Sequence, residues 1–123
     1  MFSILFVSHD AALCAAAGRA LQRAGFGVTT AAHAGHASLA CADGHEFDVL
    51  LIENEMPEGS GKAIAARLRR YCPDLAAVVM CDRRSIVPAD EIAVVRPFTA
   101  DDLIEAMFAA VAARQALRGA TSR

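Results

Sequence analysis

The strongest constraint on the fold is an alternation of short apolar runs with longer segments of helical periodicity. Apolar runs predict strands over residues 3–7, 26–30, 47–52, 75–80 and 92–95, and helical spacing predicts helices over residues 11–24, 33–42, 62–71 and 100–116. The run FDVLLI is almost continuously apolar, which is typical of a strand buried on both faces. The alternation therefore predicts a parallel sheet with helices covering both of its faces.

Length and composition narrow the class of protein. The chain has 123 residues, 55% of them hydrophobic, which is the size of one domain and supplies enough apolar side chains for a core. We expect a single domain over residues 1–118 with a loose tail over 119–123. Twelve basic and fourteen acidic side chains argue against binding to nucleic acid through bulk charge. No apolar run is long enough to span a membrane. The four cysteines form no CxxC pair and no export signal is visible, so we expect reduced thiols and a cytoplasmic location.

Polar residues follow the predicted strands at their carboxyl ends, where functional groups collect in an open parallel sheet. The architecture therefore directs attention to four groups: Ser8, His9 and Asp10; Glu53, Asn54 and Glu55; Cys81 and Asp82; and Arg96 with Pro97.

Three of these segments resemble the receiver domain of bacterial two-component response regulators. The segment FDVLLIENEMPEGSG resembles the strand and turn that hold the family's phosphorylated Asp, ILFVSHD resembles its first strand, and VVRPFTADDLIEAM resembles its last strand and final helix. The resemblance implies a flavodoxin-like three-layer α/β/α sandwich whose five parallel strands have the order 2-1-3-4-5.

The resemblance also implies a phosphorylation pocket, but this chain departs from it at most positions. The acidic pair that would bind Mg²⁺ falls on Ser8 and His9, beside Asp10. The acceptor Asp is replaced by Glu53, whose extra methylene misplaces the attacking oxygens. We therefore expect Mg²⁺ binding to be lost or weak.

Three further positions of the family's switch are altered. The hydroxyl position is Cys81, the Lys position is Arg96 and the switching aromatic is Ala93. Glu53 could pair with Arg96, supplying the negative charge internally, or could point into water; the sequence leaves both open. Arg96 beside Cys81 could lower the pKa of that thiol.

The segment between Cys81 and Arg96 is about seven residues too short for the family's fourth helix and following loop, roughly two helical turns. It also carries Pro88, so we expect this helix to be absent or a single turn. This edge is the usual signalling surface of receivers, and Arg83, Arg84, Pro97 and Phe98 are candidate partner-binding residues.

The sequence favours a degenerate receiver without enzymatic activity that acts in signal transduction by binding a protein, such as a sensor histidine kinase or another regulator, or by forming a homodimer. One alternative is an orthodox regulator phosphorylated on Glu53 or Asp10. A second is a small flavodoxin-like ligand-binding protein or thiol enzyme using Cys81. Against the second, no Gly-rich phosphate-binding loop follows the first strand.

Overall fold

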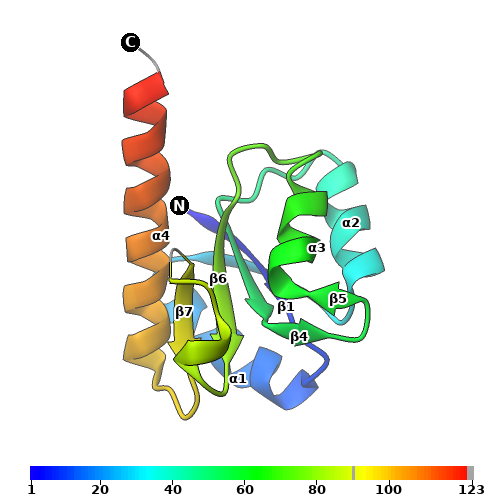
Figure 1. The fold of residues 1–123 in the computed structure, drawn as a ribbon, viewed down its shortest axis with the longest axis vertical. Helices are drawn as coiled ribbons and strands as arrows, with labels where there is room; N and C mark the ends of the chain where they lie inside the picture. The colour runs from blue at the N-terminus through cyan, green and yellow to red at the C-terminus, as the bar shows by residue number, and fades with distance from the viewer. Residues whose placement is uncertain (90, 122–123) are drawn as a thin grey trace.

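The computed structural model describes residues 1–89 and 91–121, which form a five-stranded parallel sheet with helices on both faces (Figure 1). The strand order β2-β1-β3-β6-β7 is the predicted order, because β6 and β7 are the fourth and fifth strands of this sheet. The sheet strands are β1 (Ser3–Val7), β2 (Gly27–Ala31), β3 (Val49–Glu53), β6 (Ala76–Cys81) and β7 (Ile92–Val95). The helices are α1 (Ala11–Arg23), α2 (Ala34–Ala42), α3 (Gly61–Leu68) and α4 (Ala100–Thr121).

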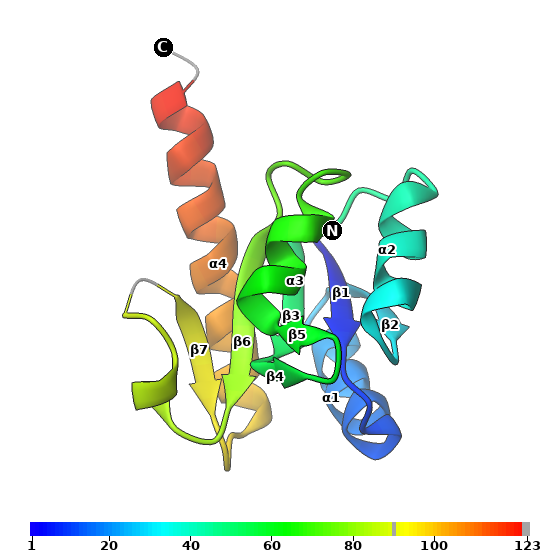
Figure 2. The ribbon, with the colours of Figure 1, turned by 45° about the vertical axis from the view of Figure 1, so that its right-hand side comes forward.

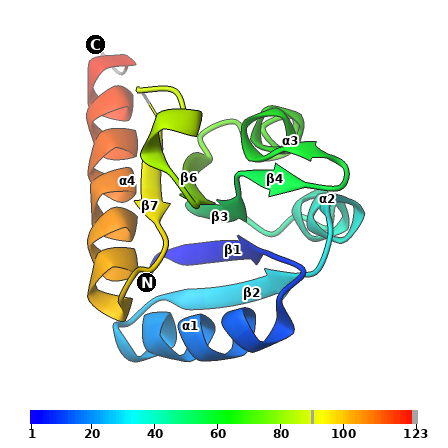
Figure 3. The same cartoon turned by 60° about the horizontal axis from the view of Figure 1, so that its bottom comes forward.

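Two apolar layers hold the helices against the sheet. Alternate β1 side chains supply both: Leu5 packs with residues of α2 and α3, and Phe6 packs with residues of α1 and α4. Figure 3, which looks along the sheet from below, shows these two pairs of helices on opposite sides of the strands. The two-sided burial explains why the central strands read as continuous apolar runs. The flavodoxin-like three-layer architecture is therefore confirmed.

The boundaries differ from the sequence-based prediction in instructive ways. Helix α2 begins at Ala34 because His33 serves as its N-cap, its Nδ1 accepting a hydrogen bond from the backbone N–H of His36 at 3.1 Å. Helix α4 continues to Thr121, beyond the predicted end, so residues 119–121 are helical and the expectation of a loose tail there is wrong. Residues 122–123 lie outside the described part of the chain.

A small antiparallel hairpin, which the sequence suggested only as a turn, follows β3 (Figure 2). It pairs β4 (Glu55–Met56) with β5 (Gly59–Ser60). Its tip reaches α2, where the Glu58 carboxylate accepts a hydrogen bond of 2.8 Å from the N–H of Ala34. The hairpin therefore caps a helix that lies far from it in the sequence.

The fourth helix of the family pattern is reduced to one 3₁₀ turn, η1 (Arg84–Ile86), as the short segment predicted. The Arg84 guanidinium holds the loop around itself by donating to four backbone carbonyls, those of residues 87, 88, 89 and 91, at 2.8–3.1 Å. One side chain thus satisfies carbonyls that a helix would have satisfied through its backbone. Within the described residues, no helix is both long and apolar enough to cross a membrane.

Candidate functional site

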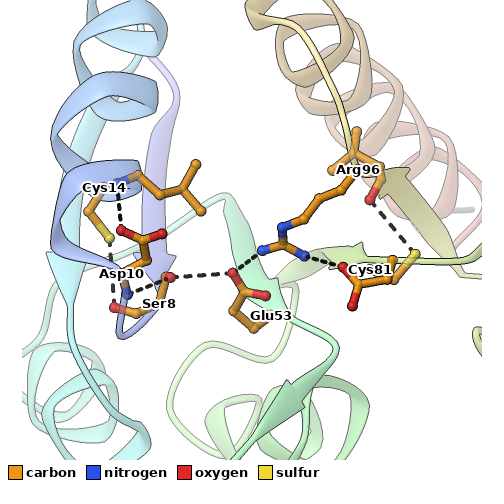
Figure 4. A network of polar contacts seen from close by, with 9 residues as sticks. Ser8, Asp10, Cys14, Glu53, Cys81 and Arg96 are labelled. Atoms are coloured by element: carbon orange, nitrogen blue, oxygen red, sulfur yellow. Dashed lines mark hydrogen bonds and ion pairs between the residues drawn. The ribbon is translucent and has the colours of Figure 1, made fainter.

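Four of the predicted residues meet at the carboxyl edge of the sheet (Figure 4). Ser8 follows β1, Glu53 ends β3, Cys81 ends β6 and Arg96 follows β7. Parallel pairing in register, with Val7 opposite Ile52 and Cys81 opposite Val95, brings the ends of these strands to the same level. The pocket is therefore a direct consequence of the sheet topology.

Glu53 and Arg96 form an ion pair across this pocket. Glu53 Oε1 accepts from Arg96 Nη2 and also from the Ser8 hydroxyl, at 3.3 Å in the second case. The Glu53 side chain is only 16% exposed, so the alternative in which it points into water is wrong. The carboxylate is partnered from both sides by residues of this chain.

Arg96 is held by further contacts. A second guanidinium nitrogen lies 3.6 Å from the exposed carboxylate of Asp82, and the guanidinium carbon lies 5.8 Å from the centre of the Phe98 ring. The backbone N–H of Arg96 donates to the carbonyl of Cys81 at 2.9 Å. These contacts position the guanidinium over the pocket and toward Glu53.

The residues after β1 have separate structural roles. Ser8 is buried, and its hydroxyl accepts a hydrogen bond of 3.1 Å from the N–H of Asp10 while donating to Glu53. The Asp10 carboxylate accepts from the N–H of Leu13 at 3.0 Å and so caps α1. His9 is exposed.

This arrangement fits a divalent cation poorly. Mg²⁺ prefers several oxygen ligands in octahedral geometry, and carboxylates are its usual protein donors. Here the Glu53 carboxylate is paired with a guanidinium and the Asp10 carboxylate is occupied at the helix start. In residues 1–89 and 91–121, no group of three or more His, Cys, Asp or Glu side chains is arranged to hold a metal ion.

The Cys81 thiol is buried, and its Sγ donates to the carbonyl of Val94 at 3.8 Å. Burial raises the pKa of this thiol, and the opposing effects of the Arg84 and Arg96 charges are smaller. Arg96 lowers this pKa as expected, but desolvation outweighs the favourable charges, so the net shift is upward. A buried, protonated thiol is a poor nucleophile.

Gly61, part of the motif that carried the family resemblance, has a specific steric role. A Cβ at this position would lie 2.6 Å from the carbonyl oxygen of Glu53 and 2.9 Å from Val79 Cγ1. Only a glycine lets the start of α3 approach the end of β3 this closely. The motif thus fixes the backbone that carries Glu53.

The remaining predicted residues lie at the edge left by the shortened helix. Ala93 and Phe98 line an open groove between β7 and α4, whose rim carries Asp102 and Glu105. Arg83 is exposed beside η1, whereas the guanidinium of Arg84 donates hydrogen bonds to the loop carbonyls. Pro97 follows Arg96 after the end of β7.

Sequence reasoning missed the contact between Glu58 and the start of α2. It also considered Ser8 only as one position of the family's acidic pair, whereas the Ser8 hydroxyl connects Asp10 to Glu53. No local signal marks either contact, because the partners of Glu58 and of the Ser8 donor lie 24 and 45 residues away.

Comparisons with known proteins agree with this description. The family model for the response regulator receiver domain matches residues 4–108. A response regulator receiver domain protein (CheY-like) from Methanospirillum hungatei JF-1 superimposes with a TM-score of 0.78 at 17% identity, covering 94% of this chain and 97% of the other.

Two further solved structures share the fold. A response regulator receiver protein from Sinorhizobium medicae WSM419 has a TM-score of 0.79 at 24% identity, covering 92% of this chain and 96% of the other. An adenylate cyclase from Rhodopirellula baltica has a TM-score of 0.84 at 20% identity, covering 98% and 94%. No curated protein sequence matches significantly.

Proposed function

Because this chain belongs to the response regulator receiver domain family, we propose that it is a receiver that signals by binding a protein partner and does not accept a phosphoryl group. Membership of the family places the chain in two-component signal transduction. The Glu53–Arg96 ion pair is the observation that carries the proposal.

The ion pair occupies the position where the resemblance puts the reactive carboxylate. An attacking carboxylate needs a free oxygen aligned with the phosphorus atom, and small misplacements reduce such reactions strongly. Glu53 Oε1 instead accepts two hydrogen bonds, from Arg96 and Ser8, and its side chain is largely buried. Glu53 carries the same single negative charge as the aspartate that it replaces, and the Arg96 guanidinium neutralises it.

We propose that magnesium binding is lost or weak for the same reason. The carboxylates of Asp10 and Glu53 have other partners, and the first residue of the expected acidic pair is a buried serine. A cation entering the pocket would have to displace the Arg96 guanidinium from Glu53. That exchange breaks the Glu53–Arg96 ion pair and leaves two positive charges, the cation and the Arg96 guanidinium, close together.

The partner-binding surface that we propose is the edge formed by η1, β7 and α4. Its shortened loop gives it a shape unlike that of receivers with a full fourth helix, and Arg83, Ile86 and Val95 are exposed on it. A sensor histidine kinase or another regulator is the class of partner that the family implies. This proposal places the protein in the cytoplasm and assigns it no enzymatic activity.

Intact-mass spectrometry after incubation with Mg²⁺ and a small phosphodonor tests the proposal. We expect the wild-type mass to remain unchanged, while an orthodox receiver treated in parallel gains one phosphoryl group. A stable single-phosphate adduct on Glu53 or Asp10 would establish the orthodox alternative instead.

A variant with four of the family's residues restored sharpens this experiment. Replacing Ser8 and Glu53 with Asp, Cys81 with Thr and Arg96 with Lys rebuilds the expected chemistry on the same backbone. We expect this variant to bind Mg²⁺ and to accept phosphate to some extent, because the fold that positions these residues is intact. Equal labelling of the wild type and the variant would refute the idea that these four positions abolish the reaction.

The thiol-enzyme alternative receives no support from the site. Cys81 is buried and the pKa of its thiol is raised. Both features reduce the thiolate population at neutral pH, on which a thiol enzyme depends.

A further inference from the structure

Two cysteines outside the phosphorylation pocket lie together in the layer between the sheet and helices α2 and α3. Cys41 is in the last turn of α2 and Cys72 follows α3, and both are buried in the same apolar cluster. Helices α2 and α3 pack side by side, as Figures 1 and 3 show. The topology therefore brings together two thiols that are 31 positions apart in the sequence.

The two thiols interact directly. The Cys72 thiol donates a hydrogen bond of 3.6 Å to the carbonyl of His45, and it lies close enough to Cys41 to affect the pKa of that thiol. Burial and the neighbouring Cys72 sulfur together raise the pKa of Cys41 to about 12. At neutral pH Cys41 therefore stays protonated.

Cys72 differs from Cys41 in its access to solvent. It lines a solvent-open pocket of about 370 Å³ together with Phe47, Tyr71 and Pro73, whereas Cys41 does not line it. Tyr71, at the mouth of this pocket, is 53% exposed. The pocket gives a small oxidant an approach to Cys72, which is 8% exposed, whereas Cys41 is 3% exposed.

We infer that Cys41 and Cys72 form a redox-sensitive pair, which a hydroperoxide oxidises to an intramolecular disulfide between the ends of α2 and α3. The inference does not depend on the proposed function, because neither cysteine belongs to the phosphorylation pocket. It adds an oxidative modification site on the opposite face of the sheet from α1 and α4.

The chemistry balances as two steps. The Cys72 thiolate attacks one oxygen of hydrogen peroxide, the O–O bond breaks, and the thiol proton leaves with the released oxygen as water, giving a sulfenic acid. The Cys41 sulfur then attacks the Cys72 sulfur, the S–O bond breaks, and the Cys41 proton leaves with the hydroxyl as a second water. Two thiols lose two electrons to the peroxide, and one S–S bond forms.

The backbone on the Cys72 side has room to close the bond. A disulfide needs an S–S length of about 2.05 Å and Cα atoms about 4.4–6.8 Å apart, so the two sulfurs must move into bonding distance. Cys72 lies in the turn after α3 ends at Leu68 and before β6 begins at Ala76, not inside a helix or strand. This turn can shift with less disturbance than an element of the sheet.

The other two cysteines provide matched controls. Cys81 is buried on β6 and hydrogen-bonds to Val94, and Cys14 lies on α1 with its Sγ 3.7 Å from the carbonyl of Ser8. Cys14 packs against the cluster on the other face of the sheet. No cysteine is among the groups that affect the pKa of Cys14 or Cys81, so neither is expected to join a disulfide.

The experiment treats folded protein with hydrogen peroxide, blocks remaining thiols under denaturing conditions and measures the intact mass. We expect two of the four thiols to become unavailable, with a loss of two mass units that reductant reverses. A background in which Cys14 and Cys81 are replaced by Ala should behave identically, and peptide mapping there should identify the Cys41–Cys72 link. The melting temperature should rise on the order of 10 °C, since the bond closes a long loop.

Single variants complete the test. C41A and C72A should each abolish the two-unit loss, and C72A should also prevent the first oxidation, because Cys72 is the accessible sulfur. Four free thiols after treatment, a sulfinic acid on Cys72 without a disulfide, or a link to Cys14 or Cys81 would each overturn the inference. Since the mapping is done on protein with both cysteines present, a folding defect in either single variant leaves the result decisive.

Discussion

Replacing Arg96 with Met removes the guanidinium that pairs with Glu53 while keeping a side chain of similar length. The Glu53 carboxylate then stays in a pocket where its side chain is 16% exposed, with the Ser8 hydroxyl as its remaining described donor. Replacing Glu53 with Gln instead removes the charge and preserves the shape. The two substitutions therefore separate the cost of an unpaired charge from the loss of the interaction itself.

The structure sets the magnitude between two limits. Breaking a fully buried ion pair by removing one partner costs about 3–5 kcal/mol, whereas a fully exposed pair contributes about 0.2–1 kcal/mol. Arg96 is 34% exposed and Glu53 is less so, which places this pair between the limits. We expect R96M to lower the free energy of unfolding by about 2 kcal/mol and E53Q by about 1 kcal/mol.

The double variant distinguishes pairing from two independent effects. With the charge of Glu53 already removed, loss of Arg96 leaves no unpaired carboxylate, so E53Q/R96M should lose only about 1.5 kcal/mol. The coupling energy of the cycle is then about 1.5 kcal/mol, within the range for residues in contact. For a domain of 123 residues, the R96M effect corresponds to a fall in melting temperature of about 8 °C.

Urea denaturation of the wild type and the three variants at neutral pH, followed by circular dichroism, measures all four free energies. The denaturant slope should stay constant, so that differences in midpoint report differences in stability. If the effects of the two single substitutions add to within about 0.3 kcal/mol, the side chains do not stabilise one another, and the reasoning from the ion pair fails.

Three further predictions use other parts of the structure. G61A should destabilise the protein by about 1–3 kcal/mol, because its Cβ would lie 2.6 Å from a carbonyl oxygen. The control G18A, whose Cβ would have its nearest contact at 3.9 Å, should be neutral or stabilising, and equal denaturation midpoints for the two variants would contradict this. R84M should speed amide hydrogen exchange in the loop after β6, because four carbonyls lose their donor. The control R83M should leave this exchange unchanged, and unchanged exchange in R84M as well would contradict the prediction. The free energy of unfolding should fall as pH rises from 9 toward 12, because Cys41 loses its proton in the unfolded chain while the folded thiol, with its pKa of about 12, retains it. Urea titrations at pH 8 and 10.5 should show a smaller fall in stability for C41A than for the wild type, and an equal fall would exclude this cause.

Much of the candidate site was predictable because the relevant signals are local. The apolar runs predicted the strands, and the ends of those strands indicated the candidate site residues Ser8, Glu53, Cys81 and Arg96. The structure brings these residues to the carboxyl edge of the sheet. The shortness of the segment after Cys81 predicted the reduction of the fourth helix to a single turn. The effect of Arg96 on the pKa of Cys81 has the predicted sign, but burial outweighs it, and no local pattern reports how completely a side chain is buried.

The sequence by itself determined the class of fold, the order of its elements and the loss of the usual acidic cluster, because periodicity, chain length and residue type act over short distances. The tertiary structure decided which of these residues interact. Glu53 contacts Arg96 and Ser8 instead of water because the register of β3 against its neighbouring strands brings the ends of these strands to one level. Cys41 and Cys72 meet because helices α2 and α3 pack on the same face. Such pairings join positions tens of residues apart, and only the packed backbone fixes the distances on which hydrogen bonds, ion pairs and thiol chemistry depend.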